Sequence, residues 1–370
     1  MLTTPAGRER ARTLGIPFSG EPGPLNAITD VAGIEVGYST LIRGEGARIV
    51  GQGPVRTGVT AILPRGRGRA DESVFASMFS LNGNGELTGS HWAAEVGRCE
   101  GPILLTNTHS VGAARDASIK WLVGRFRRTG QWSLPVVGET YDGWLNDIDG
   151  FHVAEPDIFA ALEGARGGRI EEGNVGGGTG MICYGFKGGS GTASRKVKFA
   201  GDTFTLGAFV QANFGLREQL VIAGVRVGEA LKEWKPETRK GEETGSIIAI
   251  LATDAPLIPH QLSRLARRVA LGVGRSGSVS GHGSGDIFLA FSTANAEALA
   301  ARSEIARAAL VPDPALNPFF AATIEAVDEA VLNAICAAET MTGADDHTVP
   351  ALPHEEVRAL MEKYASPRTA

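Results

Sequence analysis

The sequence KPETRKGEETGSIIAILATD, residues 235–254, changes from polar to apolar at Ser246. Its first half is rich in charged and turn-forming residues, whereas residues 247–252 form an uninterrupted apolar run. This pattern is typical of an exposed connection that enters a buried β-strand. We therefore expect a strand that begins at Ser246, with Gly245 directly before it.

The Gly245-Ser246 junction is a candidate site of self-cleavage. Glycine adopts backbone angles that are closed to other residues, so a strained peptide bond can stand before the serine. Attack by the Ser246 hydroxyl on the preceding carbonyl would give an ester, and hydrolysis would leave a new N-terminal serine. Such a residue carries both a nucleophile and a base, because its α-amine has an ordinary pKa of about 7.7–8.0. An ordinary serine at a loop-to-strand junction fits this stretch as well, since Gly-Ser before a strand is common.

Composition limits the class of protein. The chain has 370 residues, of which 43% are hydrophobic and 21% charged, as expected for a globular protein with a substantial core. The net charge of −5 argues against general nucleic-acid binding. The three cysteines are scattered, which fits a reducing compartment, and no apolar run has the length of a membrane span. We expect a cytoplasmic protein without a membrane segment.

Hydrophobic patterns predict mixed α/β layers. Strands and a hairpin dominate the first two thirds of the chain, and long helices follow late, which differs from a regular βαβ repeat. We expect a hairpin at 27–38, strands at 58–64, 196–199, 204–211 and 219–225, and helices at 111–125, 157–165, 259–271, 319–335 and 355–364.

Several familiar motifs are absent or out of context. Residues 272–277 contain G-x-G-x-x-G, but the motif ends a helix rather than opening one, so nucleotide binding is not expected. The glycines of 176–180 fit a tight turn better than an anion cradle. The chain has no G-x-S-x-G elbow and no paired histidine spacing for zinc, and among its histidines His282 is the one next to a candidate serine.

Polar groups at strand edges supply the remaining candidates. Ser284 and Asp286 are two residues apart on a predicted strand, so their side chains lie on the same face and can form one hydrogen-bonded unit. If their strand neighbours that of Ser246, they could orient the nucleophile. Asn213, at the end of another strand, and the Tyr141 hydroxyl are suitable donors to a developing oxyanion. Each of these groups could equally cap a strand or a turn.

Four short motifs in this order resemble the L-aminopeptidase/D-esterase family, which includes the β-peptidyl aminopeptidases. They are ETYDG (139–143), QANFG (211–215), TGS (244–246) and GHGSGD (281–286). The resemblance covers nearly the whole chain, from PLNAITDV (24–31) to the C-terminal helices.

The resemblance implies an αββα sandwich like that of N-terminal-nucleophile hydrolases, with its own strand connectivity. It also implies cleavage between Gly245 and Ser246 into chains 1–245 and 246–370, which together form one catalytic domain. Tetramers of the processed heterodimer are common in the family.

The resemblance also assigns roles to individual residues. Ser246 matches the nucleophile, Asn213 and Tyr141 match the groups that stabilise the tetrahedral intermediate, and Ser284 and Asp286 match the pair that orients the nucleophile. Some members, notably β-aminopeptidases, have glutamate where this chain has Asp286. Glu139 is our candidate for binding the substrate ammonium, because a carboxylate is the natural partner of that charge.

We therefore expect a cofactor-free, self-processing aminopeptidase that acts on short peptides, amides or esters. One alternative is a self-processing acyltransferase of the ornithine acetyltransferase kind, although those enzymes use an N-terminal threonine. The other is a non-catalytic protein whose glycine loops bind a small molecule.

Overall fold

The computed structural model describes residues 2–234, 245–301 and 305–364. The polar half of the opening stretch, residues 235–244, lies outside the described residues, and Thr244 of the TGS motif lies there too.

The larger of two main sheets has six strands in the order β4-β3-β12-β11-β10-β9. Strand β11 lies near its centre, parallel to β12 and antiparallel to β10. The strands are β3 (Ser73–Gly83), β4 (Arg98–Glu100), β9 (Gly189–Phe199), β10 (Asp202–Asn213), β11 (Ser246–Thr253) and β12 (Gly285–Ser292).

The smaller main sheet has four strands in the order β1-β2-β5-β6. Strands β1 and β2 form an antiparallel pair, and β5 runs parallel to β6. The strands are β1 (Glu35–Arg43), β2 (Val55–Leu63), β5 (Ile103–Asn107) and β6 (Val136–Thr140).

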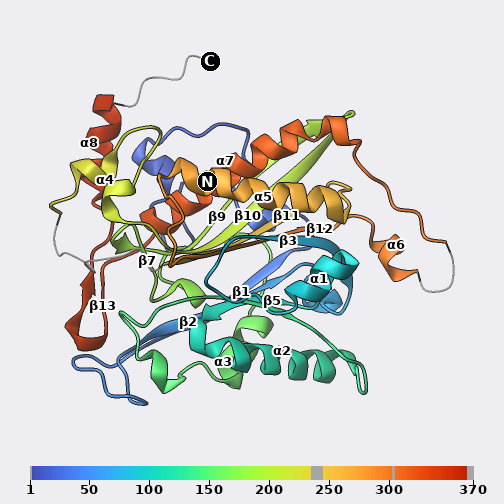
Figure 1. The fold of residues 1–370 in the computed structure, drawn as a ribbon, viewed down its shortest axis with the longest axis horizontal. Helices are drawn as coiled ribbons and strands as arrows, with labels where there is room; N and C mark the ends of the chain where they lie inside the picture. The colour runs from blue at the N-terminus through green and yellow to red at the C-terminus, as the bar shows by residue number, and fades with distance from the viewer. Residues whose placement is uncertain (1, 235–244, 302–304, 365–370) are drawn as a thin grey trace.

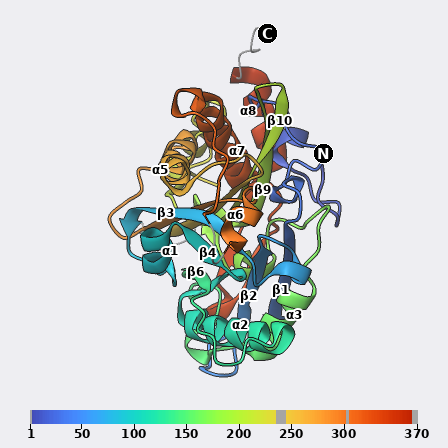
Figure 2. The same ribbon diagram turned by 90° about the vertical axis from the view of Figure 1, so that its right-hand side faces the viewer.

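The two sheets stack face to face between two layers of helices (Figure 1). Helices α5 (Pro259–Arg275) and α7 (Asn317–Cys336) cover the six-stranded sheet, and α2 (Val111–Phe126) and α3 (Glu155–Glu163) cover the four-stranded one. The view turned by 90° shows the same succession of layers (Figure 2). The αββα architecture is therefore confirmed.

Strand β11 illustrates why its sequence is apolar throughout. Ile247, Ala249 and Leu251 belong to the core beneath α5 and α7, whereas Ile248 and Ile250 belong to the core between the two sheets. Side chains alternate between the faces of a strand, so a central strand covered on both sides needs apolar residues at every position.

The smaller elements are peripheral to these layers. They include the two-stranded pairs β7–β8 (Ile182–Cys183 with Phe186–Lys187) and β13–β14 (Met341–Thr342 with Thr348–Val349), and the helices α1 (Ser90–Val96), α4 (Val227–Ala230), α6 (Ala296–Ala300) and α8 (His354–Tyr364).

Three local expectations were wrong. Residues 27–38 do not form a hairpin, because the Asp30 carboxylate accepts hydrogen bonds from the main-chain N–H groups of Leu25 and Ala27 and closes a short 3-10 turn at Ile28–Asp30. Residues 219–225 are not a strand, since Ala223 and Gly224 have φ angles of 50° and 85° and turn the apolar run back on itself. Strand β3 was not expected.

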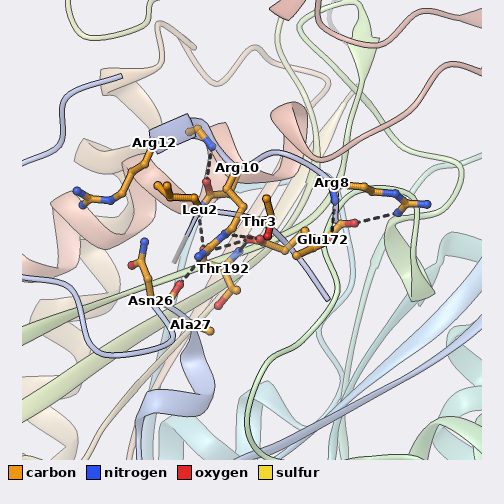
Figure 3. Close-up of polar contacts among 12 residues, drawn as sticks. Leu2, Thr3, Arg8, Arg10, Arg12, Asn26, Ala27, Glu172 and Thr192 are labelled. Atoms are coloured by element: carbon orange, nitrogen blue, oxygen red, sulfur yellow. Dashed lines mark hydrogen bonds and ion pairs between the residues drawn. The ribbon is translucent and has the colours of Figure 1, made fainter. Parts of the chain in front are cut away.

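The N-terminal arm is tied to the fold by buried charge (Figure 3). The Arg10 guanidinium, 3% exposed, forms an ion pair with Glu172 at 2.6 Å. It also donates to the main-chain oxygens of Asn26 and Thr192 at 2.7 and 2.8 Å. This buried ion pair and the hydrogen bonds of Arg10 connect the N-terminal arm to Glu172 and to Thr192 of β9.

Candidate active site

The candidate residues meet at one edge of the six-stranded sheet. Ser246 opens β11, and the ladders place it opposite Asn213, the last residue of β10, and Gly285, the first residue of β12. Parallel strands begin at the same edge, and an antiparallel neighbour ends there. The topology thus brings together residues that lie 33 or more positions apart in the chain.

Gly245 is required for a reason that differs from the expected one. Its φ is not in the left-handed region, so no conformation reserved for glycine is used there. Instead, a Cβ atom at this position would lie 2.2 Å from the main-chain oxygen of Asn213 and 2.6 Å from the Cα of Phe214. The end of β10 passes so close to the junction that no side chain fits.

Gly285 supplies a main-chain amide that sequence reasoning missed. Its N–H donates to the carbonyl oxygen of Gly245 at 3.1 Å and lies 3.3 Å from the Ser246 Oγ. The carbonyl that Ser246 would attack during self-cleavage is therefore polarised by a donor fixed in the sheet. A main-chain donor has no side-chain signature in a sequence.

Ser284 and Asp286 form the expected hydrogen-bonded unit. The Ser284 hydroxyl donates to Asp286 Oδ1 at 2.7 Å, and the two residues are 0% and 1% exposed. Burial raises the pKa of Asp286, against hydrogen bonds from Ser284, Ser280 and the main chain of Ile247 that lower it. The carboxyl is thus anchored to the residue that follows Ser246.

The Asn213 side chain is held at both ends. Its Oδ1 accepts from the Ile182 N–H at 2.8 Å, and its Nδ2 donates to the main-chain oxygen of Tyr141 at 3.0 Å. An amide nitrogen carries two protons. The second one makes no hydrogen bond to any other described residue, so it remains available beside Ser246.

A cavity of about 480 Å³ opens in front of Ser246. It lies at the edge of the interface between the two sheets, because its walls come from β6, β11 and the loops after β3, β5 and β6. It is lined by Asn84, Gly85, Glu86, Thr108, Glu139, Tyr141, Ser246 and Gly283. Asn213, Ser284 and Asp286 are not among the lining residues and are buried.

Glu139 places a carboxylate in this cavity. Its Oε1 accepts from the Glu86 N–H at 3.1 Å, and its Oε2 accepts from the Thr108 hydroxyl. Burial raises the pKa of Glu139, and the nearby Glu86 carboxylate contributes in the same direction. Tyr141, also on the lining, is 38% exposed, and its ring lies against Gly143.

The other motifs do not enter the site. His282 is exposed and outside the cavity lining. Gly272 and Gly274 lie inside α5, where a Cβ on Gly272 would approach Val327 to 2.7 Å. The N–H groups of Gly176 and Gly177 donate to Thr40 and Thr60, which fits the tight turn rather than an anion cradle.

Among the described residues, no cluster of three or more His, Cys, Asp or Glu side chains is arranged to hold a metal ion. Within the same ranges, no helix is both long and apolar enough to cross a membrane.

Comparison with known proteins decides the family. The model of peptidase family S58 matches residues 26–349. The chain belongs to this family. A β-peptidyl aminopeptidase of Sphingosinicella microcystinivorans is 50% identical over 368 residues, which cover 96% of this chain and 92% of that protein.

Solved structures agree with this S58 assignment. The L-aminopeptidase D-Ala-esterase/amidase of Ochrobactrum anthropi, described as a prototype of the serine aminopeptidases and a variant of the Ntn hydrolase fold, is 48% identical with a TM-score of 0.90. That match covers 96% of this chain and 99% of the other. A Burkholderia β-aminopeptidase is 43% identical with a TM-score of 0.85, over 97% and 99% of the two chains. The prediction of an aminopeptidase with a serine nucleophile is confirmed.

Proposed function

We propose that this S58 chain cuts itself between Gly245 and Ser246, and that the new N-terminal Ser246 is then the nucleophile of an aminopeptidase. The observation that carries the proposal is the position of the Gly285 N–H, which donates to the Gly245 carbonyl and lies beside the Ser246 hydroxyl. The products are chains 1–245 and 246–370, which remain one catalytic domain.

Self-cleavage begins when Ser246 Oγ bonds to the Gly245 carbonyl carbon. The hydroxyl proton passes to the Ser246 nitrogen as the C–N bond breaks, so the chain is held by an ester and the Ser246 amine is free. The Gly285 N–H stabilises the oxyanion of this step. Water hydrolyses the ester, which leaves a Gly245 carboxylate and restores the hydroxyl.

Turnover repeats the same chemistry on a substrate in the cavity. Ser246 Oγ attacks the substrate carbonyl while its own α-amine takes the hydroxyl proton and later transfers it to the leaving amine. Asn213, through its second Nδ2 proton, and the Tyr141 hydroxyl stabilise the oxyanion. The Ser284–Asp286 pair orients the Ser246 main chain through Ile247. Water hydrolyses the acyl-enzyme.

Glu139 binds the ammonium of the substrate, and this restricts cleavage to the N-terminal residue. The carboxylate and Ser246 line the same cavity, and the described lining residues include no Lys, Arg or His side chain to compete for it. The substrates are short peptides, amides or esters, and the relatives support both β-peptides and D-alanine derivatives as compounds to assay first. A tetramer of processed heterodimers and a cytoplasmic location remain predictions.

The relatives favour this function over the acyltransferase and over the binding protein. The decisive experiment follows the intact mass and the activity of Ser246→Ala beside the wild type. We expect the wild type to give two chains, the smaller beginning Ser246-Ile247-Ile248, and Ser246→Ala to stay uncut and inactive. A Ser246→Ala protein that is cut and active would falsify the mechanism.

A further inference from the structure

A buried lysine, Lys187, belongs to the small hairpin that binds the Asn213 side chain. Strands β7 and β8 form a small hairpin in which Ile182 is paired with Lys187. Its two turn residues, Tyr184 and Gly185, have φ angles of 51° and 65°, as a tight two-residue hairpin requires. The Ile182 N–H that binds Asn213 Oδ1 therefore belongs to the residue opposite Lys187.

The Lys187 ammonium is bonded entirely to main-chain oxygens. It is 0% exposed, and its Nζ donates to the carbonyl oxygens of Met181 at 2.7 Å, Gly188 at 3.0 Å and Gly178 at 3.4 Å. In the protonated form, three donors thus have three acceptors, and two of these acceptors lie in the segment 178–181 that leads into Ile182.

This lysine has no ion-pair partner among the described residues. Burial lowers its pKa to about 7, although the Asp142 charge acts in the opposite direction. A buried cation without a carboxylate is costly, and an apolar residue would avoid that cost. The three hydrogen bonds to main-chain oxygens offset part of that cost and fix the segment 178–181.

We propose that Lys187 is a positioning residue of the reaction that acts through Asn213. Its ammonium fixes the main chain of 178–181, and this sets the Ile182 N–H that orients the Asn213 carboxamide. One Nδ2 proton is then directed to the Tyr141 oxygen and the other to the oxyanion. The inference rests on the proposed role of Asn213 beside Ser246.

The test compares Lys187→Met with wild type after self-cleavage has run to completion. We expect kcat to fall by roughly tenfold or more with KM changed less than about twofold, because the oxyanion donor is misplaced while the substrate cavity is intact. Self-cleavage, followed by intact mass, should also slow if the Asn213 carboxamide serves that step.

A double-mutant cycle with Asn213→Ala isolates the route of the effect. If Lys187 acts through Asn213, adding Lys187→Met to Asn213→Ala should lower kcat by less than about twofold further. Fully additive losses, or a Lys187→Met enzyme with wild-type kcat, would overturn the inference. If the proposed function itself is wrong, a different result distinguishes this case, because the Ser246→Ala protein is then cut and active.

The matched control is Arg195→Met. Arg195 is another buried cation, 1% exposed, and it forms an ion pair with Glu329 at 2.8 Å on the side of the sheet that faces α7. We expect a lower melting temperature and an unchanged kcat for the folded enzyme. Lys187→Gln, which keeps a donor, serves as the second variant and should have an intermediate kcat. If neither Lys187 variant folds while Arg195→Met does, the ammonium is needed for stability and the inference fails.

Discussion

Replacing Gly245 by alanine tests how tightly the cleavage junction is held. A Cβ atom there would lie 2.2 Å from the Asn213 main-chain oxygen, whereas such contacts in real structures do not fall below about 3.0 Å. The junction and the end of β10 must separate by close to 1 Å, since the obstructing atoms are main chain. A misplacement of about 1 Å can cost on the order of 10² in rate, which is about 2.7 kcal/mol of activation free energy.

We therefore expect Gly245→Ala to fold but to cleave itself on the order of 100 times more slowly than the wild type. The assay is a time course of intact mass on freshly purified precursor, with circular dichroism to establish that the fold is retained. Gly274→Ala in α5 is the control, because a Cβ at that position meets no atom within 4 Å. Cleavage of Gly245→Ala at the wild-type rate would refute the argument that close packing aligns the Gly245 carbonyl with Ser246.

Three further predictions concern the groups around the nucleophile. Ser284→Ala removes the 2.7 Å hydrogen bond to Asp286 and should lower kcat on the order of 10²-fold without unfolding the chain. The control is Ser292→Ala, at the far end of β12, which should leave kcat unchanged. Burial raises the pKa of Glu139 above 4.5, so its negative charge is lost, and KM should rise, as the pH falls through that raised value. Glu139→Gln should have a high KM at every pH while still cutting itself at the normal rate. Burial raises the pKa of Asp142 from 3.8 to about 6, so the folded state binds more protons than the unfolded state between these values. The melting temperature should therefore decrease as pH rises from about 4 to 6. Asp142→Asn should make that decrease smaller without abolishing it, because burial raises the pKa of Glu139 and Asp286 as well.

The sequence was sufficient to locate the nucleophile and its neighbours at strand ends. An apolar run directly after Ser246 predicted β11, and the two-residue spacing of Ser284 and Asp286 predicted the hydrogen bond that the structure has. Asn213 was expected to end a strand, and it does.

Other parts of the site depend on contacts between distant segments, which local patterns do not encode. The Gly285 N–H is a main-chain group, so only the β11–β12 register reveals it. Lys187 resembles any surface lysine in the sequence, whereas in the fold it is fully buried in the β7–β8 hairpin that binds Asn213. The expected strain at Gly245 was replaced by a steric limit set by residues 213 and 214, which lie more than 30 positions away in the sequence.

The strand order β3-β12-β11-β10 has a consequence for how the enzyme can be made. In the proposed products, β3 and β10 belong to chain 1–245 and β11 and β12 to chain 246–370, so the smaller chain is inserted between two strands of the larger one. The uncut precursor can assemble this sheet as a unimolecular reaction. After cleavage, denatured chains must find each other first, so recovery depends on concentration and competes with aggregation. The species that folds is thus the uncut precursor, whereas the proposed active enzyme is its two-chain product.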